Sequence, residues 1–317
     1  MTAFYITEDF PKSQIEFDKR FATEAACYEY LFRIKWPNGF TCSKCGYQSY
    51  WISSKNIYIC TRCESQFSLT ADTIMHDTKK PITYWFRAMW WFTTRKSGVN
   101  AINLQDLLGC SYVTAWSWLQ KLRQCTIRKD REKLSGKIEV DEFFIGGPKP
   151  GKRGRGSEGK SIVVAAVERK GRKLGRIRLH VVDDCSADSL TAFIDQNIAA
   201  GSYVTTDGWK GYDSIDQDRY NHHQVFLSKS KDNYSALSGV HLIASLVKRI
   251  IIGTFQGRFE PKYLQHYLDE YVFRFNRRTS MSIGKKFMRI VQQVALSAKI
   301  TCRQIKNGIN ADLLLQN

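Results

Sequence analysis

The sequence contains no apolar run long enough to cross a membrane. A transmembrane helix needs about 18 or more consecutive apolar residues, and no uncharged stretch of the 317-residue chain approaches that length. The N-terminal segment, MTAFYITEDFPKSQIEF, is acidic and lacks the apolar core of a signal peptide. These absences predict a cytoplasmic protein without membrane contact, whose thiols stay reduced.

Acidic residues are also scarce. The chain has 30 Asp and Glu against 48 Lys and Arg, which leaves a formal net charge of +18. A globular protein this basic usually binds a polyanion, most often nucleic acid. The alternative is that the positive charges are spread over the surface and bind no partner. Because 43% of the residues are hydrophobic, the chain can form a sizeable core, in two or three domains.

Four of the nine cysteines form two C-x₂-C pairs, CSKC and CTRC, with fourteen residues between them. Two such pairs at this distance place four thiolates tetrahedrally around a structural zinc ion. The intervening SYWISSKNIYIC is typical of a β-hairpin, and Gly46 allows a tight turn after the first pair. A redox pair or unrelated cysteines are the alternatives. The expected zinc ligands are Cys42, Cys45, Cys60 and Cys63.

The segment after the cysteines has the pattern of helix, tight turn, helix. Residues 99–108, Gly109 and residues 111–124 fit a helix-turn-helix. A plain helical hairpin with a solvated polar face is the alternative. Inward packing is expected of Val113, Trp116, Leu119 and Leu122. The polar stripe expected to enter a DNA major groove consists of Thr114, Ser117, Lys121 and Gln124.

Two carboxylates interrupt the strand-like pattern that begins at residue 137. Asp141 lies within IEVDEFFIG and Asp207 ends YVTTDGW. A carboxylate at such a place is unfavourable unless it is hydrogen-bonded or bound to a cation, and two from neighbouring strands suit the Mg²⁺ sites of phosphoryl transfer. Strand-end aspartates also cap turns, and alternation places Glu142 on the face opposite Asp141. The rival carboxylates are Glu142, Asp183 and Asp184.

Taken in order, these features resemble the DDE-type transposases of bacterial insertion sequences, in the group with a zinc ribbon and an ISXO2-like catalytic domain. The motifs are FTCSKCG, IEVDEFFIGG, VTTDGWKGY, HLIASLVKR and YLDEYVFRFNRR. The resemblance implies a ribonuclease-H-like domain that uses Mg²⁺ or Mn²⁺ to cut DNA at terminal inverted repeats and join the ends to target DNA. It places the first two carboxylates on Asp141 and Asp207.

The third position of that family is a helical glutamate or asparagine, with a lysine seven residues later. Counting back from Lys248 gives His241, in SGVHLIASLVKR. Residues seven apart share a helix face, so the resemblance implies that Asp141, Asp207 and His241 surround divalent ions while Lys248 contacts phosphate. Imidazole suits Mn²⁺ better than Mg²⁺, and it can also act as an acid or base. An inert histidine and a solvated lysine are the alternatives.

Further DNA contacts are expected from basic side chains, although simple solvation of these charges is the alternative. The segment 146–160 predicts a basic loop that becomes ordered on DNA, and Trp209 is expected either to stack on an unpaired base or to pack beneath the site. The complete set of expected DNA-binding residues is Thr114, Ser117, Lys121, Lys152, Arg153, Arg155, Lys248, Arg249, Arg277 and Arg278.

We therefore expect a multidomain α+β transposase that acts on double-stranded DNA as a homo-oligomer, in the bacterial cytoplasm and at the nucleoid when bound. The alternatives are a repurposed transposase that only binds DNA, and a nuclease that cuts without joining. The expected divisions are a helical segment (1–36), a zinc ribbon (37–72), a helix-turn-helix region (78–130), a ribonuclease-H-like α/β domain with a mixed sheet (136–290) and a C-terminal tail (291–317).

Overall fold

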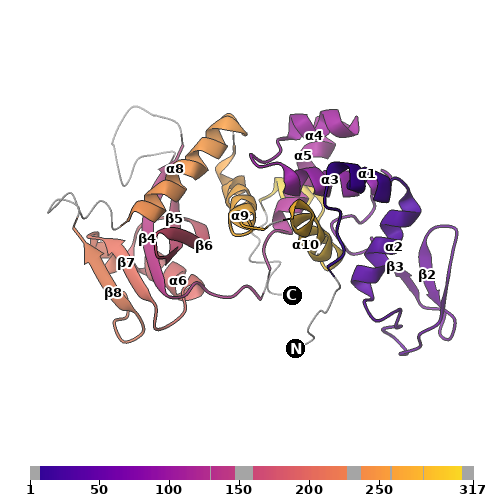
Figure 1. The fold of residues 1–317 in the computed structure, drawn as a ribbon, viewed down its shortest axis with the longest axis horizontal. Coiled ribbons are helices and arrows are strands. Elements are labelled where there is room, and N and C mark those ends of the chain that lie inside the picture. The colour runs from indigo at the N-terminus through magenta and orange to yellow at the C-terminus, as the bar shows by residue number, and fades with distance from the viewer. Residues whose placement is uncertain are drawn as a thin grey trace. The chain divides into compact units, whose positions relative to one another are not determined.

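The computed structural model describes residues 8–128, 130–146, 160–226, 237–257, 259–280 and 282–308. They belong to two compact units, one of Met1–Arg128 with Thr279–Asn317 and one of Lys129–Arg278 (Figure 1). The second unit thus ends before the expected boundary at residue 290. Part of the expected C-terminal tail is helical, in α11 (Cys302–Lys306). No helix in the described ranges is long and apolar enough to cross a membrane.

An aromatic cluster explains why the chain returns to the first unit after residue 278. Phe17 stacks on Trp90 with 4.7 Å between ring centroids, and Phe287 lies edge-on to both rings. Ser13 and Thr23 each cap a helix, so the expected helical segment contains two helices. These rings lie on α1 (Gln14–Arg20), α3 (Ile82–Thr94) and α10 (Ile283–Ala295), and α2 (Glu24–Lys35) adds Tyr30, which stacks on Phe287.

Two smaller substructures complete the described part of the first unit. Strands β1 (Tyr50–Ile52), β2 (Ile57–Cys60) and β3 (Gln66–Ser68) form an antiparallel sheet in that order. Helices α4 (Ala101–Leu108) and α5 (Tyr112–Gln124) are joined by a tight turn, in which Gly109 adopts a left-handed φ of 55°. Glycine adopts that conformation without steric cost. The two helices and the tight turn between them have the expected helix-turn-helix geometry.

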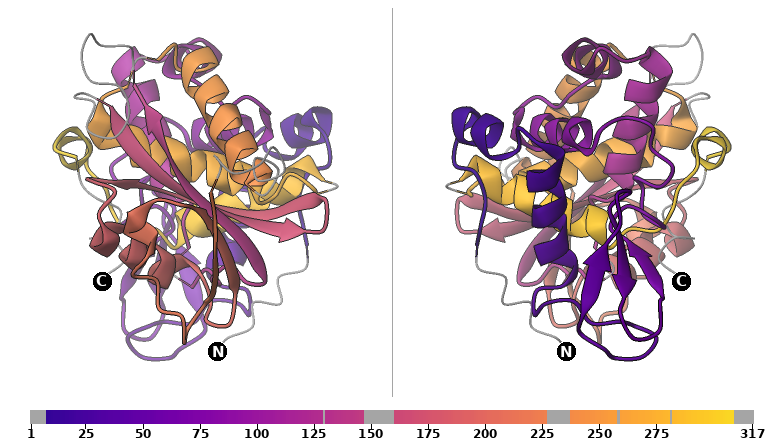
Figure 2. Two further views of the ribbon diagram at one scale, coloured as in Figure 1. Left: turned by 90° about the vertical axis from the view of Figure 1, so that its left-hand side faces the viewer. Right: turned by 90° about the vertical axis from the view of Figure 1, so that its right-hand side faces the viewer.

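The second unit is built on a mixed five-stranded sheet in the order β6-β5-β4-β7-β8 (Figure 2). In this sheet β5 pairs antiparallel with both β4 and β6, and β7 pairs parallel with both β4 and β8. This arrangement confirms the expected ribonuclease-H-like α/β fold. The strands are β4 (Lys137–Ile145), β5 (Ser161–Lys170), β6 (Lys173–Val182), β7 (Tyr203–Asp207) and β8 (Asn221–Val225).

Helices cover both faces of this sheet and produce two apolar clusters. On one face, Phe143 and Val167 pack with residues of α8 (Ser238–Gly253) and α9 (Leu264–Phe275), the latter preceded by the short helix η2 (Pro261–Tyr263). On the other face, Val140 and Val204 pack with residues of α6 (Ala187–Asn197) and η1 (Lys210–Tyr212). Because strand residues alternate between faces, Asp141 lies on the side covered by α8.

Candidate active site and zinc centre

The four motif cysteines come together as the sequence predicts. Their sulfur atoms lie within 4.8 Å of one another, with Cys42 to Cys63 at 3.5 Å and Cys45 to Cys60 at 3.6 Å. These distances exceed the ~2.05 Å of a disulfide and are close to the ~3.8 Å between sulfurs bound tetrahedrally to zinc at ~2.3 Å. The donor set therefore fits a structural zinc ion with no position left open.

The backbone around each cysteine pair forms the same turn. The N–H of Gly46 donates to the carbonyl of Cys42, and the N–H of Glu64 donates to the carbonyl of Cys60. Both turns need a left-handed residue, which is Gly46 at φ 72° and Glu64 at φ 57°. Hydrogen bonding with Ser65 lowers the pKa of the Cys63 thiol to about 6, and a thiolate is the form that binds zinc.

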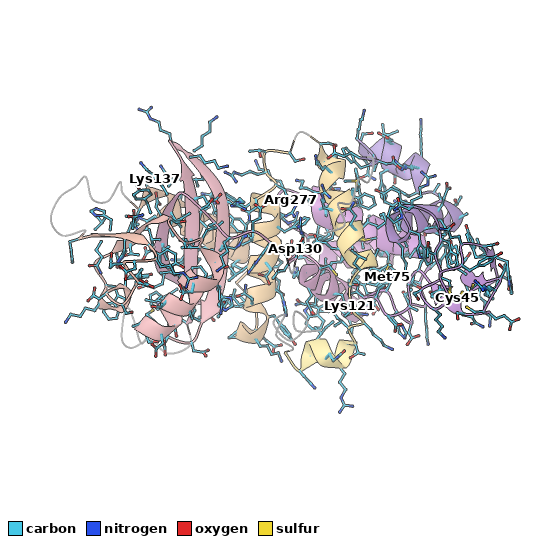
Figure 3. The ribbon with its side chains drawn as sticks, turned by 90° about the horizontal axis from the view of Figure 1, so that it is seen from below. Cys45, Met75, Lys121, Asp130, Lys137 and Arg277 are labelled. Carbon is cyan, nitrogen blue, oxygen red and sulfur yellow. The ribbon has the colours of Figure 1, made fainter. Side chains whose placement is uncertain are left out.

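The helix-turn-helix is present, but its second helix is rotated from the expected orientation. Ser117 is buried and its hydroxyl donates to the carbonyl of Thr114, while the Lys121 ammonium donates to the carbonyl of Ile74 at 3.0 Å (Figure 3). Val113, expected to pack inward, is 54% exposed. The predicted stripe is therefore not an exposed surface at Ser117 and Lys121, because α5 is buried on several sides and its buried residues include the polar Gln120 and Arg123.

The two strand aspartates meet at one edge of the sheet. The parallel pairing of β4 and β7 ends at Glu139 with Thr205, so Asp141 and Asp207 each lie two residues beyond the last pair and on the same face. Asp141 Oδ1 accepts a hydrogen bond from the N–H of Glu142, and Asp207 Oδ1 accepts one from the N–H of Trp209. Asp207 is thus a turn cap as well as a member of the site.

Glu142 joins this pair, against the expectation from strand alternation. Oxygen atoms of Asp141, Glu142 and Asp207 lie within 4.8 Å of one another. Although Glu142 starts from the opposite face, its carboxylate reaches the aspartates where β4 and β7 are no longer paired, and its Oε2 accepts a hydrogen bond from Tyr212 at 2.9 Å. Burial raises the pKa of Tyr212 well above its ordinary value, so this phenol remains a donor.

Helix α8 brings His241 to the same edge. Its Nε2 lies 3.2 Å from Oδ2 of Asp141, while the close group of three carboxylates does not include the imidazole. Burial lowers the pKa of His241, and the charge of Asp207 opposes that shift. This shift favours the neutral imidazole, whose Nε2 faces a carboxylate oxygen of the group.

The remaining expected residues divide into three sets. Lys248 is exposed with its Nζ 5.7 Å from the centre of the Phe143 ring, and Arg249 is exposed beside it. Arg277 (Figure 3) donates to the carbonyl of Phe273, and Arg278 to those of Gly175 and Phe275, so both guanidinium groups already have protein partners. The expected loop residues Lys152, Arg153 and Arg155 lie outside the described residues.

Two further expectations concern residues near the site. Trp209 is half-buried against the α6 side of the sheet, and its Nε1 donates to the carbonyl of Cys185, which supports packing beneath the site over stacking on a base. Asp184 accepts hydrogen bonds from the Ser186 N–H and the Ser189 hydroxyl at the start of α6. A turn at the end of the strand thus accounts for this rival carboxylate.

The carboxylate group fits a divalent metal ion. Three carboxylates at this spacing repel one another unless a cation or protons neutralise them, and carboxylate oxygen is the ligand that Mg²⁺ and Mn²⁺ prefer. Glu142 is a third carboxylate beside the two aspartates, whereas the family pattern places the third site residue at His241. Only the loss of strand pairing beyond Glu139 makes Glu142 recognisable, and that feature has no signal in the sequence.

Comparisons with known proteins agree with this geometry. Residues 133–276 match the ISXO2-like transposase domain, and residues 22–66 match the transposase zinc-ribbon domain. The chain is also 25% identical, over 231 residues, to an uncharacterized protein in the transposable element ISH50 of Halobacterium salinarum. That similarity covers 63% of this chain and 72% of the relative. The chain belongs to the transposases of insertion sequences that join a zinc-ribbon domain to an ISXO2-like DDE domain.

Proposed function

We propose that this transposase binds the terminal inverted repeats of an insertion sequence and performs metal-dependent strand cleavage and strand transfer. The observation that carries the proposal is the convergence of Asp141, Glu142 and Asp207 at one edge of the sheet, within 4.8 Å and beside His241. The zinc ribbon and the helix-turn-helix are the parts of the chain proposed to recognise the ends of the element.

In this proposal, the three carboxylates hold Mg²⁺ or Mn²⁺, which supplies charge neutralisation for the phosphodiester and activation of the attacking hydroxyl. His241 is proposed to orient Asp141 for the metal ion, because its Nε2 lies 3.2 Å from Asp141 Oδ2 and burial, which lowers its pKa, favours the neutral imidazole as a donor to that oxygen. His241 therefore acts next to the carboxylates. The metal-ligand role expected from the sequence would require its Nε2, and that nitrogen faces Asp141.

Lys248 and Arg249 are proposed to hold the DNA backbone at this site. Both side chains are exposed on α8, and Lys248 stands over Phe143 on the face that carries Asp141. A lysine provides a compact charge for a phosphate. Assembly on paired element ends as a homo-oligomer is part of the same proposal, which follows from the family.

Single substitutions of the aspartates test the function. Asp141→Ala and Asp207→Ala should each abolish cleavage of DNA that carries the terminal inverted repeats, while binding to those ends is retained. Glu142→Gln should weaken cleavage in the same way if the third carboxylate holds metal. Normal cleavage by either alanine variant would contradict the assignment. A product in which the cut end is joined to target DNA distinguishes transposition from simple nuclease activity.

A further inference from the structure

The start of helix α8 is held on the sheet by one buried carboxylate. Glu139 lies on β4 two residues before Asp141, so both side chains point to the α8 face, and only 4% of Glu139 is exposed. Its Oε2 accepts a hydrogen bond from the N–H of Val240 at 2.8 Å, and the N–H of Gly239 bonds to the same carboxylate. Its Oε1 lies 3.3 Å from Nε of Arg169.

This carboxylate replaces the cap that α8 lacks. The N-cap residue, Leu237, makes no side-chain hydrogen bond to the first turn. The first N–H groups of a helix need acceptors from outside the helix and carry a partial positive charge that favours an anion. Glu139 meets both requirements from a different element, so the end of α8 is tied to β4 and not merely packed against it.

Gly239 permits the close approach. A Cβ at this position would lie 2.7 Å from Oε2 of Glu139 and 2.9 Å from both Arg169 and Leu174. Such distances are too short for a side chain, so a larger residue would displace the ends of these side chains, including the carboxylate that caps the helix. The glycine therefore matters here for space and not for its backbone angles.

We propose that Glu139 is a positioning residue that holds His241 against Asp141. His241 follows Val240 directly, so the hydrogen bond from the Val240 N–H fixes the height and rotation of the first turn at the residue before the imidazole. Asp141 and Glu139 lie on one strand and His241 and Val240 on one helix, and the cap joins the two elements next to the catalytic contact. The inference rests on the proposed function for its importance, but the positioning can be measured without activity.

The test follows the Nε2 resonance of His241 in protein labelled with ¹⁵N histidine, at fixed pH and without divalent catalytic metal, with zinc retained. His241→Gln assigns the signal, and Asp141→Asn shows its position when the partner is changed. Glu139→Gln removes the charge of the cap while it keeps the size of the side chain. It should shift the His241 signal and slow strand cleavage by about 10- to 100-fold, because small misplacements of a reacting group have effects of that size. Binding to the element ends should be unchanged.

Glu168→Gln is the matched control. Glu168 is a β5 carboxylate that is 3% exposed, bonds to an arginine and accepts backbone N–H groups, but it lies on the opposite face of the sheet. Its substitution should lower stability and leave the His241 signal in place. Equal shifts in both glutamine variants would overturn the proposal, since they would reflect general loosening of the sheet.

Gly239→Ala gives a second, independent perturbation of the same contact and decides the case if Glu139→Gln does not fold. An unmoved His241 signal in the variants that fold would also overturn the proposal. If the signal moves in Glu139→Gln while Asp141→Ala still cleaves DNA, the positioning stands and the proposed catalytic function fails, so the two failures can be told apart.

Discussion

Tyr212→Phe removes a hydrogen bond from a buried phenol to the proposed metal site. The Tyr212 side chain is fully buried, and its hydroxyl donates to Oε2 of Glu142 at 2.9 Å. Phenylalanine keeps the ring and its packing, so the substitution removes little except this O–H group. We expect the variant to fold and to bind divalent metal more weakly, because the carboxylate of Glu142 loses the partner that orients it.

Two arguments give the size of this effect. A hydrogen bond to a charged group is worth about 1.5–3 kcal/mol, and Glu142 is only 8% exposed, so water replaces the lost partner poorly. Loss of a partner that orients a metal ligand typically weakens binding about 10- to 100-fold, which corresponds to about 1.4–2.7 kcal/mol. The two ranges overlap, so we expect the Kd for Mn²⁺ to rise by one to two orders of magnitude.

The assay is a titration of Mn²⁺ followed by electron paramagnetic resonance of the free ion, on protein that retains zinc. Tyr220→Phe is the control, because Tyr220 is 2% exposed in the same apolar cluster and donates to Asp195 at 2.9 Å, away from the site. The control should lower stability and leave the Kd unchanged. If Tyr212→Phe binds Mn²⁺ as tightly as the parent protein, the assignment of Glu142 to the metal site is wrong.

Three other predictions concern pH, zinc and the helix-turn-helix. Burial lowers the pKa of His222 below 6.5, so below that pH the unfolded chain binds a proton that the folded chain does not, and the free energy of unfolding should fall as pH drops. His222→Gln should reduce this fall in denaturant titrations, whereas His223→Gln, on the exposed face of β8, should reduce it less, because the charge of His223 is a smaller cause of the shift than burial. A strong chelator should remove zinc and unfold β1–β3 while the five-stranded sheet stays folded, and hydrogen exchange measures both. Amides of β1–β3 that stay protected after zinc loss would exclude a structural role for the metal. Lys121→Met should lower the melting temperature, because the carbonyl of Ile74 loses its donor, and should leave the salt dependence of DNA binding unchanged; a slope reduced by about one would mean that Lys121 contacts a phosphate.

The zinc ribbon shows where local sequence suffices. Each cysteine pair lies within a turn of a few residues, and the backbone hydrogen bonds that shape both turns are local to the pair. The β-hairpin between the pairs, with Tyr50 opposite Cys60, then brings the two turns together. The spacing of the cysteines and one hairpin therefore contain nearly all the information that the site needs.

The second helix of the helix-turn-helix shows where local sequence misleads. Trp118 stacks on Trp85 of α3 with 3.9 Å between ring centroids, and Lys121 reaches the carbonyl of Ile74. Ala115, Trp118 and Leu119 are buried together with Ser117. A helix with so many buried positions has no single polar stripe to read, so its neighbours decide which side chains face solvent.

The sequence by itself predicted the four-cysteine cluster and the two strand aspartates, which depend on spacing and periodicity along the chain, and the family resemblance pointed to His241 through its distance from Lys248. Only the tertiary structure placed Glu142 among the aspartates, because β4 and β7 stop pairing after Glu139 and Thr205. It also tied α8 to Glu139, because a carboxylate on one strand can cap a helix that begins about a hundred residues later only when the fold brings the two together.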